Sequence, residues 1–330
     1  MSESVQSFYK IASIPGSGLG VVATKTFSRG DLIISEFPLF IIDGATVDGI
    51  SGAEATIEKD VAQLSSKNQQ AISSLHNCFV GKLSPLLGIF KTNSLPLGTD
   101  SVAAGLFLVC SRFNHSCIPN AMYSWNPTIS QGCIYALDEI SPEEEITINY
   151  LSQNDRKSIR EDRQRTLLMN FDFECLCAVC ANDLHEIRAS DHRRRNIRSM
   201  EEIIESDLYI RSNPEKALGF CQRILNLWEE EGVNDVTLYT TYYEALRICV
   251  IHGDYPRAKA FAKLALRVKE ECEGSDDISE RLDHIKALVK DPQSHALAGS
   301  SNKWLSKAKK GGDVQFGSED FEEWLWYRAE

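Results

Sequence analysis

The chain has 330 residues, of which 43% are hydrophobic and 25% are charged, and its formal net charge at pH 7 is -12. This length allows two domains with separate cores, and the composition is ordinary for a globular protein. An acidic chain does not hold a nucleic-acid backbone through charge, so we expect no direct nucleic-acid partner. The charge instead favours a basic partner, such as a lysine-rich peptide.

The sequence also argues against a membrane protein. No run approaches the roughly 18 apolar residues of a membrane helix, and residues 1–6 lack the basic and apolar parts of a secretory signal. Ten cysteines in such a chain are expected to be reduced thiols or metal ligands. We therefore expect a cytoplasmic or nuclear protein without a membrane partner.

The first half of the chain alternates short apolar runs with turn residues. This pattern predicts strands at residues 21–23, 32–34, 39–42, 121–125, 133–137 and 146–150. Helical periodicity spans residues 53–77, and a charged helix is expected over residues 155–170. The apolar run 103–109 is also predicted to be helical. Many short strands with a helical insertion indicate a small α+β domain.

Beyond Ala181 the pattern becomes that of amphipathic helices. They are expected at residues 184–211, 214–231, 236–252, 256–273 and 278–290. Six residues resemble the second helix of a tetratricopeptide repeat: Gly253, Tyr255, Ala258, Ala262, Ala265 and Leu266. Ordinary antiparallel helices are the alternative. Residues 298–330 are expected to form a mobile linker followed by an aromatic tail, residues 316–327, that docks on the protein or on a partner.

Residues 112–120, with the sequence RFNHSCIPN, crowd polar side chains behind an apolar run. Buried amides and imidazoles need hydrogen-bond partners or a ligand, because leaving them unpaired costs free energy. Taken alone, the segment could equally be a turn that closes a core element.

Three further cysteines, Cys175, Cys177 and Cys180, lie within six residues of one another. Zinc favours four tetrahedral ligands in closed structural sites, and cysteine sulfur is a preferred ligand. A fourth ligand must come from elsewhere, and chemistry alone leaves several candidates: Cys78, Cys110, Cys117, Cys133 and His115.

Four motifs in order resemble those of the SET-domain methyltransferases. They are residues 18–23, residues 112–120, the segment 146–150 that ends in Tyr150, and the cysteine-rich segment 173–180. The resemblance covers about residues 8–181. It implies a β-rich SET fold with a helical insertion at about 44–111 and a post-SET zinc knuckle at 171–181. An all-α, tetratricopeptide-like domain over residues 182–297 would follow.

The resemblance also implies two cofactors, S-adenosylmethionine and a structural Zn²⁺. It selects Cys117 as the fourth zinc ligand beside the three knuckle cysteines. The residues that match the cofactor-binding positions of the family are Gly18, Leu19, Asn114, His115, Tyr150 and Phe173, with Asn93 as a looser match. Phe173 corresponds to the aromatic residue that stacks on adenine.

Tyr150 is the expected catalytic residue. Methyl transfer depends mainly on orienting the nucleophile in line with the donor, and a phenol hydroxyl can do this. A lysine acceptor has an ordinary pKa of about 10.4, so it must lose a proton before it attacks. Desolvation beside a positive sulfonium would lower that pKa.

The chain departs from the SET and MYND group in one respect. Residues 44–85 contain a single cysteine, Cys78, so they cannot form a MYND finger. The architecture therefore resembles that of fungal SET-domain proteins without this finger.

Three functions stay open from the sequence. The first is methylation of lysine in a protein or peptide, favoured by the acidic residues Glu139, Glu143, Glu144 and Glu145. The second is methylation of a carboxylate or hydroxyl in a small molecule, for which basic residues follow Tyr150: Arg156, Lys157, Arg160, Arg163 and Arg165. The third is a helical scaffold without catalysis.

Overall fold

The structure is a computed structural model, and it describes residues 8–45, 49–99, 101–275, 280–301, 304 and 318–327. The chain divides into two compact units. The first comprises Met1–Arg156, Glu161–Ala181 and Glu271–Asp277, and the second comprises Lys157–Arg160, Asn182–Glu270 and Ile278–Glu330. None of the described helices combines the length and apolar character needed to cross a bilayer.

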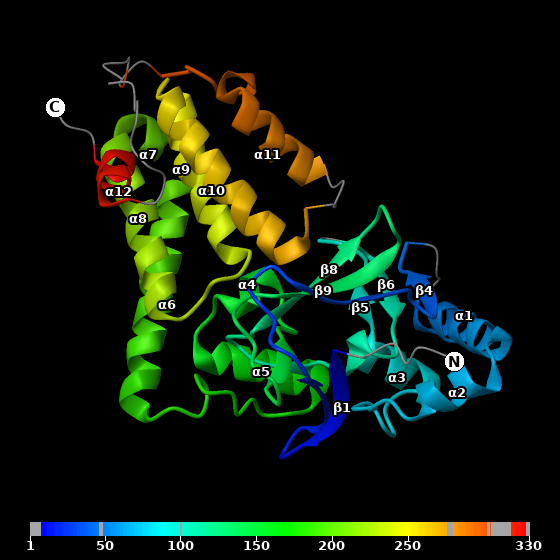
Figure 1. The fold of residues 1–330 in the computed structure, drawn as a ribbon. Helices are drawn as coiled ribbons and strands as arrows, with labels where there is room; N and C mark the ends of the chain where they lie inside the picture. Colours follow the sequence, from blue (N-terminus) through cyan, green and yellow to red (C-terminus); the bar gives the residue numbers. More distant parts are fainter. Residues whose placement is uncertain are drawn as a thin grey trace. The chain divides into compact units, whose positions relative to one another are not determined.

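The strands of the first unit form three small sheets in the described part of the chain (Figure 1). Their bounds are β1 (Tyr9–Ile14), β2 (Gly18–Ala23), β3 (Leu32–Glu36), β4 (Phe40–Asp43), β5 (Leu95–Pro96), β6 (Ala103–Leu106), β7 (Asn114–His115), β8 (Ala121–Asn126), β9 (Gln131–Ala136) and β10 (Glu145–Ile148). The sheet orders are β1-β2-β10-β7, β3-β9-β8 and β4-β6-β5. In the first sheet β7 and β10 are parallel, whereas β1, β2 and β10 pair antiparallel.

In the sequence, the helices of the first unit lie between β4 and β5, between β6 and β7, and after β10. They are α1 (Gly49–Gln63), α2 (Ser66–Ser73), α3 (Pro85–Asn93), the 3-10 helix η1 (Cys110–Arg112), α4 (Gln153–Arg156) and α5 (Arg160–Phe171). Ile57, Ile72 and Leu87 of the first three helices pack with Phe40 and Leu106 in one core cluster. The predicted helical insertion is therefore present as α1–α3, but residues 44–111 also contain β5 and β6.

The expected helix over residues 103–109 is wrong. Residues 103–106 form β6, which lies between β4 and β5. A short apolar run does not distinguish a buried strand from a helix by periodicity. This segment is a strand because β4 and β5 pair with it on its two sides. Gly105 permits close packing there, since a Cβ would stand 2.9 Å from the Pro38 side chain and 3.1 Å from that of Phe107.

Two expected helices are each divided. The charged helix over 155–170 is split into α4 and α5, and the carboxylate of Asp191 accepts the Arg160 main-chain N–H at the start of α5. The expected helix over 184–211 is split into α6 (Leu184–Ile204) and α7 (Asp207–Ser212). The Ser206 hydroxyl accepts the Tyr209 N–H at 3.4 Å and caps α7. In both cases a side chain satisfies main-chain groups that a continuous helix would have paired internally.

The second unit is helical. Besides α6 and α7 it contains α8 (Pro214–Glu230), α9 (Thr237–Ile251), α10 (Tyr255–Glu273), α11 (Glu280–Lys290), the 3-10 helix η2 (Pro292–Ser294) and α12 (Glu319–Trp326). The last three residues of α10 belong to the first unit. Figure 1 shows α8, α9 and α10 side by side, and their facing apolar residues form one large core cluster.

The aromatic tail packs into that cluster. Phe321, Leu325 and Trp326 of α12 are buried, and the Phe261 and Trp326 ring centroids are 4.9 Å apart. Docking of the tail on the protein is thus confirmed for its described part, whereas Phe316 and most of the expected linker lie outside the described residues. The tetratricopeptide likeness and the division at residue 297 stay predictions.

Candidate functional site

The motif over residues 112–120 is held to β10 at both ends. Asn114 and His115 form β7, parallel to Thr147 and Ile148. At the other end the Asn120 side chain accepts the Thr147 main-chain N–H at 2.8 Å and donates to the Glu145 carbonyl at 2.9 Å. The polar residues of this motif therefore find partners in the strand that leads to Tyr150.

Tyr150 lies just after β10, which ends at Ile148 rather than at Tyr150. The Tyr150 main-chain N–H donates to His115 Nδ1 at 3.0 Å, and its hydroxyl donates to the Phe113 carbonyl at 2.6 Å. Burial, together with the charge of Glu145, raises the pKa of the Tyr150 phenol above its ordinary value of 10. The hydroxyl therefore stays protonated at neutral pH and acts as a fixed dipole.

Three rings gather around that of Tyr150, and the four residues are called here the aromatic group: His115, Tyr150, Phe171 and Phe173. The Tyr150 ring centroid lies 5.0 Å from that of Phe171, 5.4 Å from that of His115 and 6.4 Å from that of Phe173. His115 and Phe173 are 6.1 Å apart. Three segments distant in sequence thus place aromatic faces against one another, and Phe173 is only partly buried.

His115 links the aromatic group to the cysteines. Its Nδ1 accepts the Tyr150 N–H, and its Nε2 lies 3.5 Å from Cys117 Sγ. Burial lowers the pKa of this imidazole to about 4, with the charges of Arg163 and Arg156 acting in the same direction against that of Cys177. A neutral imidazole at pH 7 is compatible with an N–H acceptor role at Nδ1. Both ring nitrogens are engaged within the protein, so a ligand would meet the main chain of His115.

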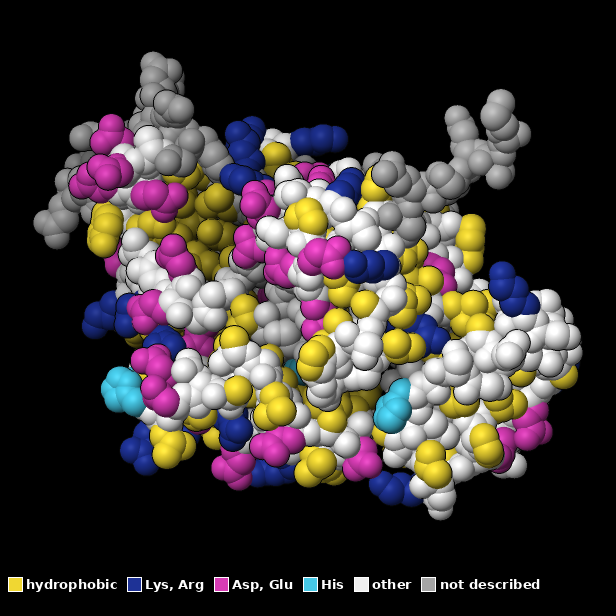
Figure 2. Space-filling model, turned by 60° about the horizontal axis from the view of Figure 1, so that its bottom comes forward, with side chains coloured by type: hydrophobic (Ala, Val, Ile, Leu, Met, Phe, Trp, Pro, Cys, Tyr) yellow, Lys and Arg dark blue, Asp and Glu magenta, His cyan; other side chains and the backbone are white. Residues whose placement is uncertain are grey.

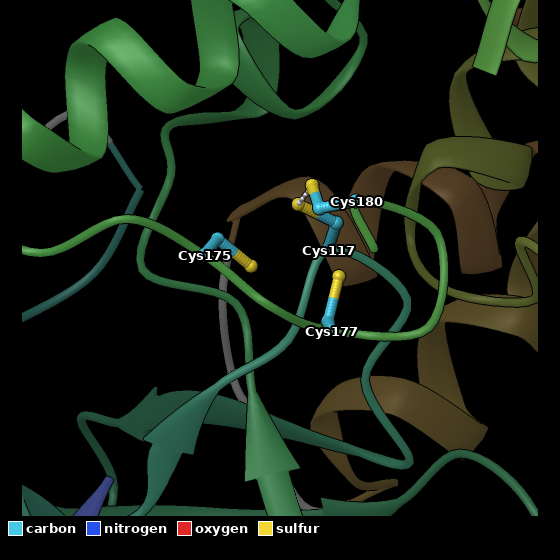
Figure 3. A group of neighbouring side chains, drawn as sticks. All are labelled: Cys117, Cys175, Cys177 and Cys180. Carbon is cyan, nitrogen blue, oxygen red and sulfur yellow. Dashed lines mark hydrogen bonds between the residues drawn. The ribbon is translucent and has the colours of Figure 1, made fainter. Parts of the chain in front are cut away.

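The four predicted zinc ligands converge (Figure 3). The Sγ atoms of Cys117, Cys175, Cys177 and Cys180 all lie within 4.8 Å of one another, and those of Cys117 and Cys180 are 3.5 Å apart. Tetrahedral Zn²⁺ with Zn–S bonds of about 2.3 Å separates its sulfurs by about 3.8 Å. The four sulfur donors and their spacing therefore fit one zinc ion. Hydrogen bonds from the neighbouring thiols lower the pKa of the Cys177 thiol.

Arg163 of α5 completes this cluster. It is 1% exposed, and its Nε and Nη2 donate to Cys117 Sγ at 3.3 Å and to Cys180 Sγ at 3.8 Å. A buried guanidinium requires an anion, since its charge is costly away from water. Four thiolates around Zn²⁺ carry two net negative charges, so Arg163 offsets part of the charge that a bound metal would leave.

Two glycines of β2 differ in their surroundings. Gly18 has φ of +80°, and no atom lies within 4 Å of the position that a Cβ would take. A Cβ on Gly20 would instead meet Asn114 Nδ2 at 2.7 Å and Glu145 Oε1 at 2.8 Å. Gly18 thus leaves the main chain open to a ligand, while Gly20 makes room for an internal hydrogen bond.

That hydrogen bond joins Asn114 Nδ2 to Glu145 Oε1 at 2.8 Å, and the same amide reaches the Leu19 carbonyl at 3.4 Å. Asn114 is therefore close to the start of β2, where Gly18 and Leu19 lie. Leu19 itself is 51% exposed. These residues lie on β2 and β7, the two strands that flank β10 in the first sheet.

Asn93 has a different environment. It is buried at the end of α3, where its Nδ2 donates to the carbonyls of His76 at 2.7 Å and Ile89 at 2.6 Å. Its own carbonyl accepts the Ser111 hydroxyl at 2.8 Å. The side-chain amide nitrogen is thus used to fix the end of α3, and the structure connects Asn93 to the motif through Ser111.

The acidic run expected to attract a basic substrate is partly used within the protein. Glu143 pairs with Lys10 at 2.5 Å, Glu144 accepts the Ser141 N–H at 3.0 Å, and Glu145 accepts from Asn114. On the basic side, Arg165 pairs with Glu161 and Asp162, as expected for a solvated helix face.

The sequence named Arg163 only as a cationic group for a small acceptor, and it gave Phe171 no role beyond its place in the knuckle segment, so their contacts with the cysteines and with Tyr150 were missed. Both lie on α5, which the pattern identified only as charged with a modest apolar side. Their spacing of eight residues places both on one helix face, together with Leu167. A positive residue on the apolar face of a helix just before a cysteine cluster was the available signal.

The comparisons with known proteins agree with this geometry. Residues 18–151 match the SET domain family. The histone-lysine N-methyltransferase set5 of Schizosaccharomyces pombe is 32% identical over 291 residues, which cover 88% of this chain and 86% of the relative. The chain therefore belongs to the SET-domain family and is a methyltransferase. Methyltransferases of this family use S-adenosylmethionine.

Other relatives match over shorter parts. The human protein-lysine N-trimethyltransferase SMYD5 is 39% identical over 83 residues, covering 25% of this chain and 20% of the relative. The zebrafish N-lysine methyltransferase SMYD2-A is 23% identical over 244 residues, covering 64% of this chain and 53% of the relative. The chain thus spans about half of one of these relatives and a fifth of the other.

Proposed function

We propose that this chain transfers a methyl group from S-adenosylmethionine to the side-chain amine of lysine in a protein or peptide. The observation that carries the proposal is that the aromatic group adjoins strands β2, β10 and β7, which hold Gly18 and Asn114, and that the Phe113 carbonyl accepts the Tyr150 hydroxyl beside them. The relatives named above, which act on lysine in proteins, support the same acceptor class.

The residues present fit the proposed cofactor. The main chain at Gly18 has open space where a side chain would stand, and the partly buried ring of Phe173 can take a stacked base. When bound, the cofactor supplies an electrophilic methyl group on a positive sulfonium. The cofactor would be held mainly by main-chain groups of Gly18, Leu19, Asn114 and His115. Asn93 would act from further away.

Tyr150 is assigned to orientation of the acceptor. An amine would have to be neutral to take the methyl group that the bound cofactor would supply, and Tyr150 would orient that amine. The phenol stays protonated at neutral pH, so it is not the base that deprotonates the amine. Its hydroxyl and the Phe113 carbonyl instead define where an amine can sit.

Zinc is assigned to Cys117, Cys175, Cys177 and Cys180 as a structural ion. It would join the motif over 112–120 to the segment that carries Phe173, and thereby fix two sides of the cofactor site. All four ligand positions are cysteines, which is typical of closed structural sites.

The competing functions have weaker support. A small carboxylate acceptor needs free cationic groups, but Lys157 pairs with Glu201 at 2.7 Å, and Arg163 and Arg165 are engaged as described. On the face drawn in Figure 2, Lys and Arg side chains are interspersed with Asp and Glu side chains. This mixed charge does not favour a nucleic-acid partner. Action in the nucleus or cytoplasm is proposed from the cysteine usage and from the histone-modifying relative.

Calorimetric titration of the zinc-loaded chain with S-adenosylmethionine and with its demethylated product tests the proposal. Both should bind at one site, and Asn114→Ala should weaken binding more than Tyr150→Phe does. The absence of heat and of any thermal shift with either compound would reject the proposal. The pH dependence then separates acceptors: transfer to an amine should rise with pH, whereas transfer to a carboxylate should be flat above about pH 5.

A further inference from the structure

Glu36, the last residue of β3, binds three successive main-chain N–H groups. One of its carboxylate oxygens accepts from Leu108 at 2.8 Å and from Val109 at 3.1 Å, and the other accepts from Val109 at 3.1 Å and from Cys110 at 2.8 Å. Hydrogen bonds to an ionised acceptor are stronger than those between neutral groups. One side chain thus fixes the turn that begins η1.

This turn leads directly to the site. From Cys110 the chain passes through η1 to Phe113, whose ring is fully buried and whose carbonyl accepts the Tyr150 hydroxyl at 2.6 Å. Asn114, the next residue, joins β10. A three-residue 3-10 helix offers little length over which a displacement of the turn could be absorbed, so the position of residues 108–110 determines that of the Phe113 carbonyl.

The surroundings of Glu36 make its charge effective. Cys110 and Cys133 are 0% and 1% exposed. Burial raises the pKa of Cys110, and the charge of Glu36 raises it further. Glu36 itself is partly buried, and electrostatic interactions are stronger where water is partly excluded, so its carboxylate holds the three N–H groups more firmly than a fully exposed cap would.

We infer that Glu36 is a positioning residue for methyl transfer: it fixes the turn at 108–110 and, through it, the Phe113 carbonyl that orients the Tyr150 hydroxyl. The inference rests on the role proposed for Tyr150. Glu36 would touch neither the cofactor nor the acceptor and would act only through the turn. None of the four sequence motifs includes it.

The variant that tests the inference is Glu36→Gln. It keeps the shape of the side chain but turns one acceptor into an NH₂ group facing main-chain donors. Glu36→Asp keeps the charge and withdraws the carboxylate by one methylene, so it serves as the second variant if the first does not fold. Asp183→Asn is the matched control, because Asp183 also accepts two main-chain N–H groups, those of His185 and Glu186, but in the second unit.

The first readout needs no substrate. In the full zinc-loaded chain with ¹³Cζ-labelled tyrosine, the Tyr150 resonance is assigned by its loss in Tyr150→Phe. Glu36→Gln, or Glu36→Asp, should shift this resonance, whereas Asp183→Asn should leave it unchanged. A folded Glu36 variant with an unchanged Tyr150 resonance would overturn the inference and leave Glu36 as a stabilising residue only.

The second readout is a double-mutant cycle on kcat with core histones and saturating S-adenosylmethionine. Glu36→Gln should lower kcat about tenfold with little change in the KM for cofactor, and should add less than about twofold in the Tyr150→Phe background. Independent, multiplicative losses would contradict the inference. If Tyr150→Phe alone keeps wild-type kcat, the proposed role of Tyr150 fails, while the resonance still decides whether Glu36 positions it.

Discussion

The hydroxyl of Tyr150 donates a hydrogen bond to the main-chain carbonyl of Phe113 at 2.6 Å. A tyrosine that follows one strand is thereby joined to the residue that precedes the other strand of a parallel pair, β7 and β10. The bond fixes the phenol in a partly buried position, and loss of contact with water raises its pKa. Orientation rather than proton transfer is the chemistry that this arrangement offers.

Tyr150→Phe should keep the ring contacts and lose this dipole. We expect kcat to fall by a factor on the order of 10², as for removal of one oriented donor in other enzymes, with cofactor affinity nearly unchanged. Because the pKa of the phenol lies above 10, the wild-type rate should show no decrease caused by its ionisation up to about pH 10. Steady-state rates across pH, with calorimetry on the same preparations, provide the check.

Arg163→Met should loosen the metal site without removing a ligand. The variant leaves the charge of a zinc–thiolate cluster uncompensated in a buried place, so zinc should dissociate roughly 10- to 100-fold faster. Transfer of zinc to a chromophoric chelator measures this directly. Arg165→Met, on the exposed face of the same helix, is the control and should release zinc at the wild-type rate. Equal rates in both variants would show that Arg163 does not act on the metal.

Much of the site was predictable because its chemistry is local in sequence. Cys175, Cys177 and Cys180 lie within one short segment, and the spacing alone indicated a metal. Their convergence with Cys117 needed the family resemblance, since five ligands were equally plausible on chemistry. The strands β2 and β3 were also predictable, because β-branched runs beside turn residues specify them. The aromatic residues Tyr123 and Trp125 favour the strand at β8.

The rest depended on contacts between distant segments. Glu36 and Arg163 are ordinary charged residues in the sequence, and only the fold brings one against the turn at 108–110 and the other against two sulfurs. The error at 103–109 has the same origin: an apolar run becomes a strand because β4 and β5 pair with it on both sides. Local pattern does not carry that information.

Gly20→Ala should weaken cofactor binding. The new Cβ would stand 2.7 Å from Asn114 Nδ2 and 2.8 Å from Glu145 Oε1, so it must separate a pair that fixes the motif. We expect a loss of affinity of about tenfold or more, measured by calorimetry. Gly219→Ala is the control: it lies on α8 with no atom within 4 Å of the new Cβ and should bind normally and be slightly more stable. Wild-type cofactor affinity in Gly20→Ala would contradict the assignment of cofactor binding to β2 and Asn114.

Glu231 should be a principal source of stability in the second unit. Its carboxylate pairs with Arg193 at 2.5 Å and with the buried Arg194 at 2.8 Å. Burial alone would raise its pKa, but Arg194, Ser190 and Arg193 outweigh burial and lower it. Breaking such a buried pair costs about 3–5 kcal/mol, so Glu231→Gln should lower the free energy of unfolding by about this amount.

The same pair gives a pH dependence of defined sign. A carboxylate with a lowered pKa stabilises the folded state above its ordinary value of 4.5, and this contribution is lost as pH falls through the lower folded value. Wild type should therefore lose more stability than Glu231→Gln on acidification below pH 4.5. Thermal unfolding followed by the circular dichroism of the helices measures this stability. The control is Arg198→Ala, which breaks only an exposed pair with Glu202 and should change the free energy of unfolding by less than about 1 kcal/mol.

Transfer of a methyl group to a lysine amine is the activity proposed for this chain. The most direct test incubates the zinc-loaded chain with methyl-labelled S-adenosylmethionine, core histones and a mixture of small carboxylic acids, and locates the label by tandem mass spectrometry. We expect label on the side-chain nitrogen of lysine, strongly reduced in Tyr150→Phe and in Asn114→Ala. Label on a carboxylate or hydroxyl but on no lysine, from protein that binds the cofactor, would contradict this proposal.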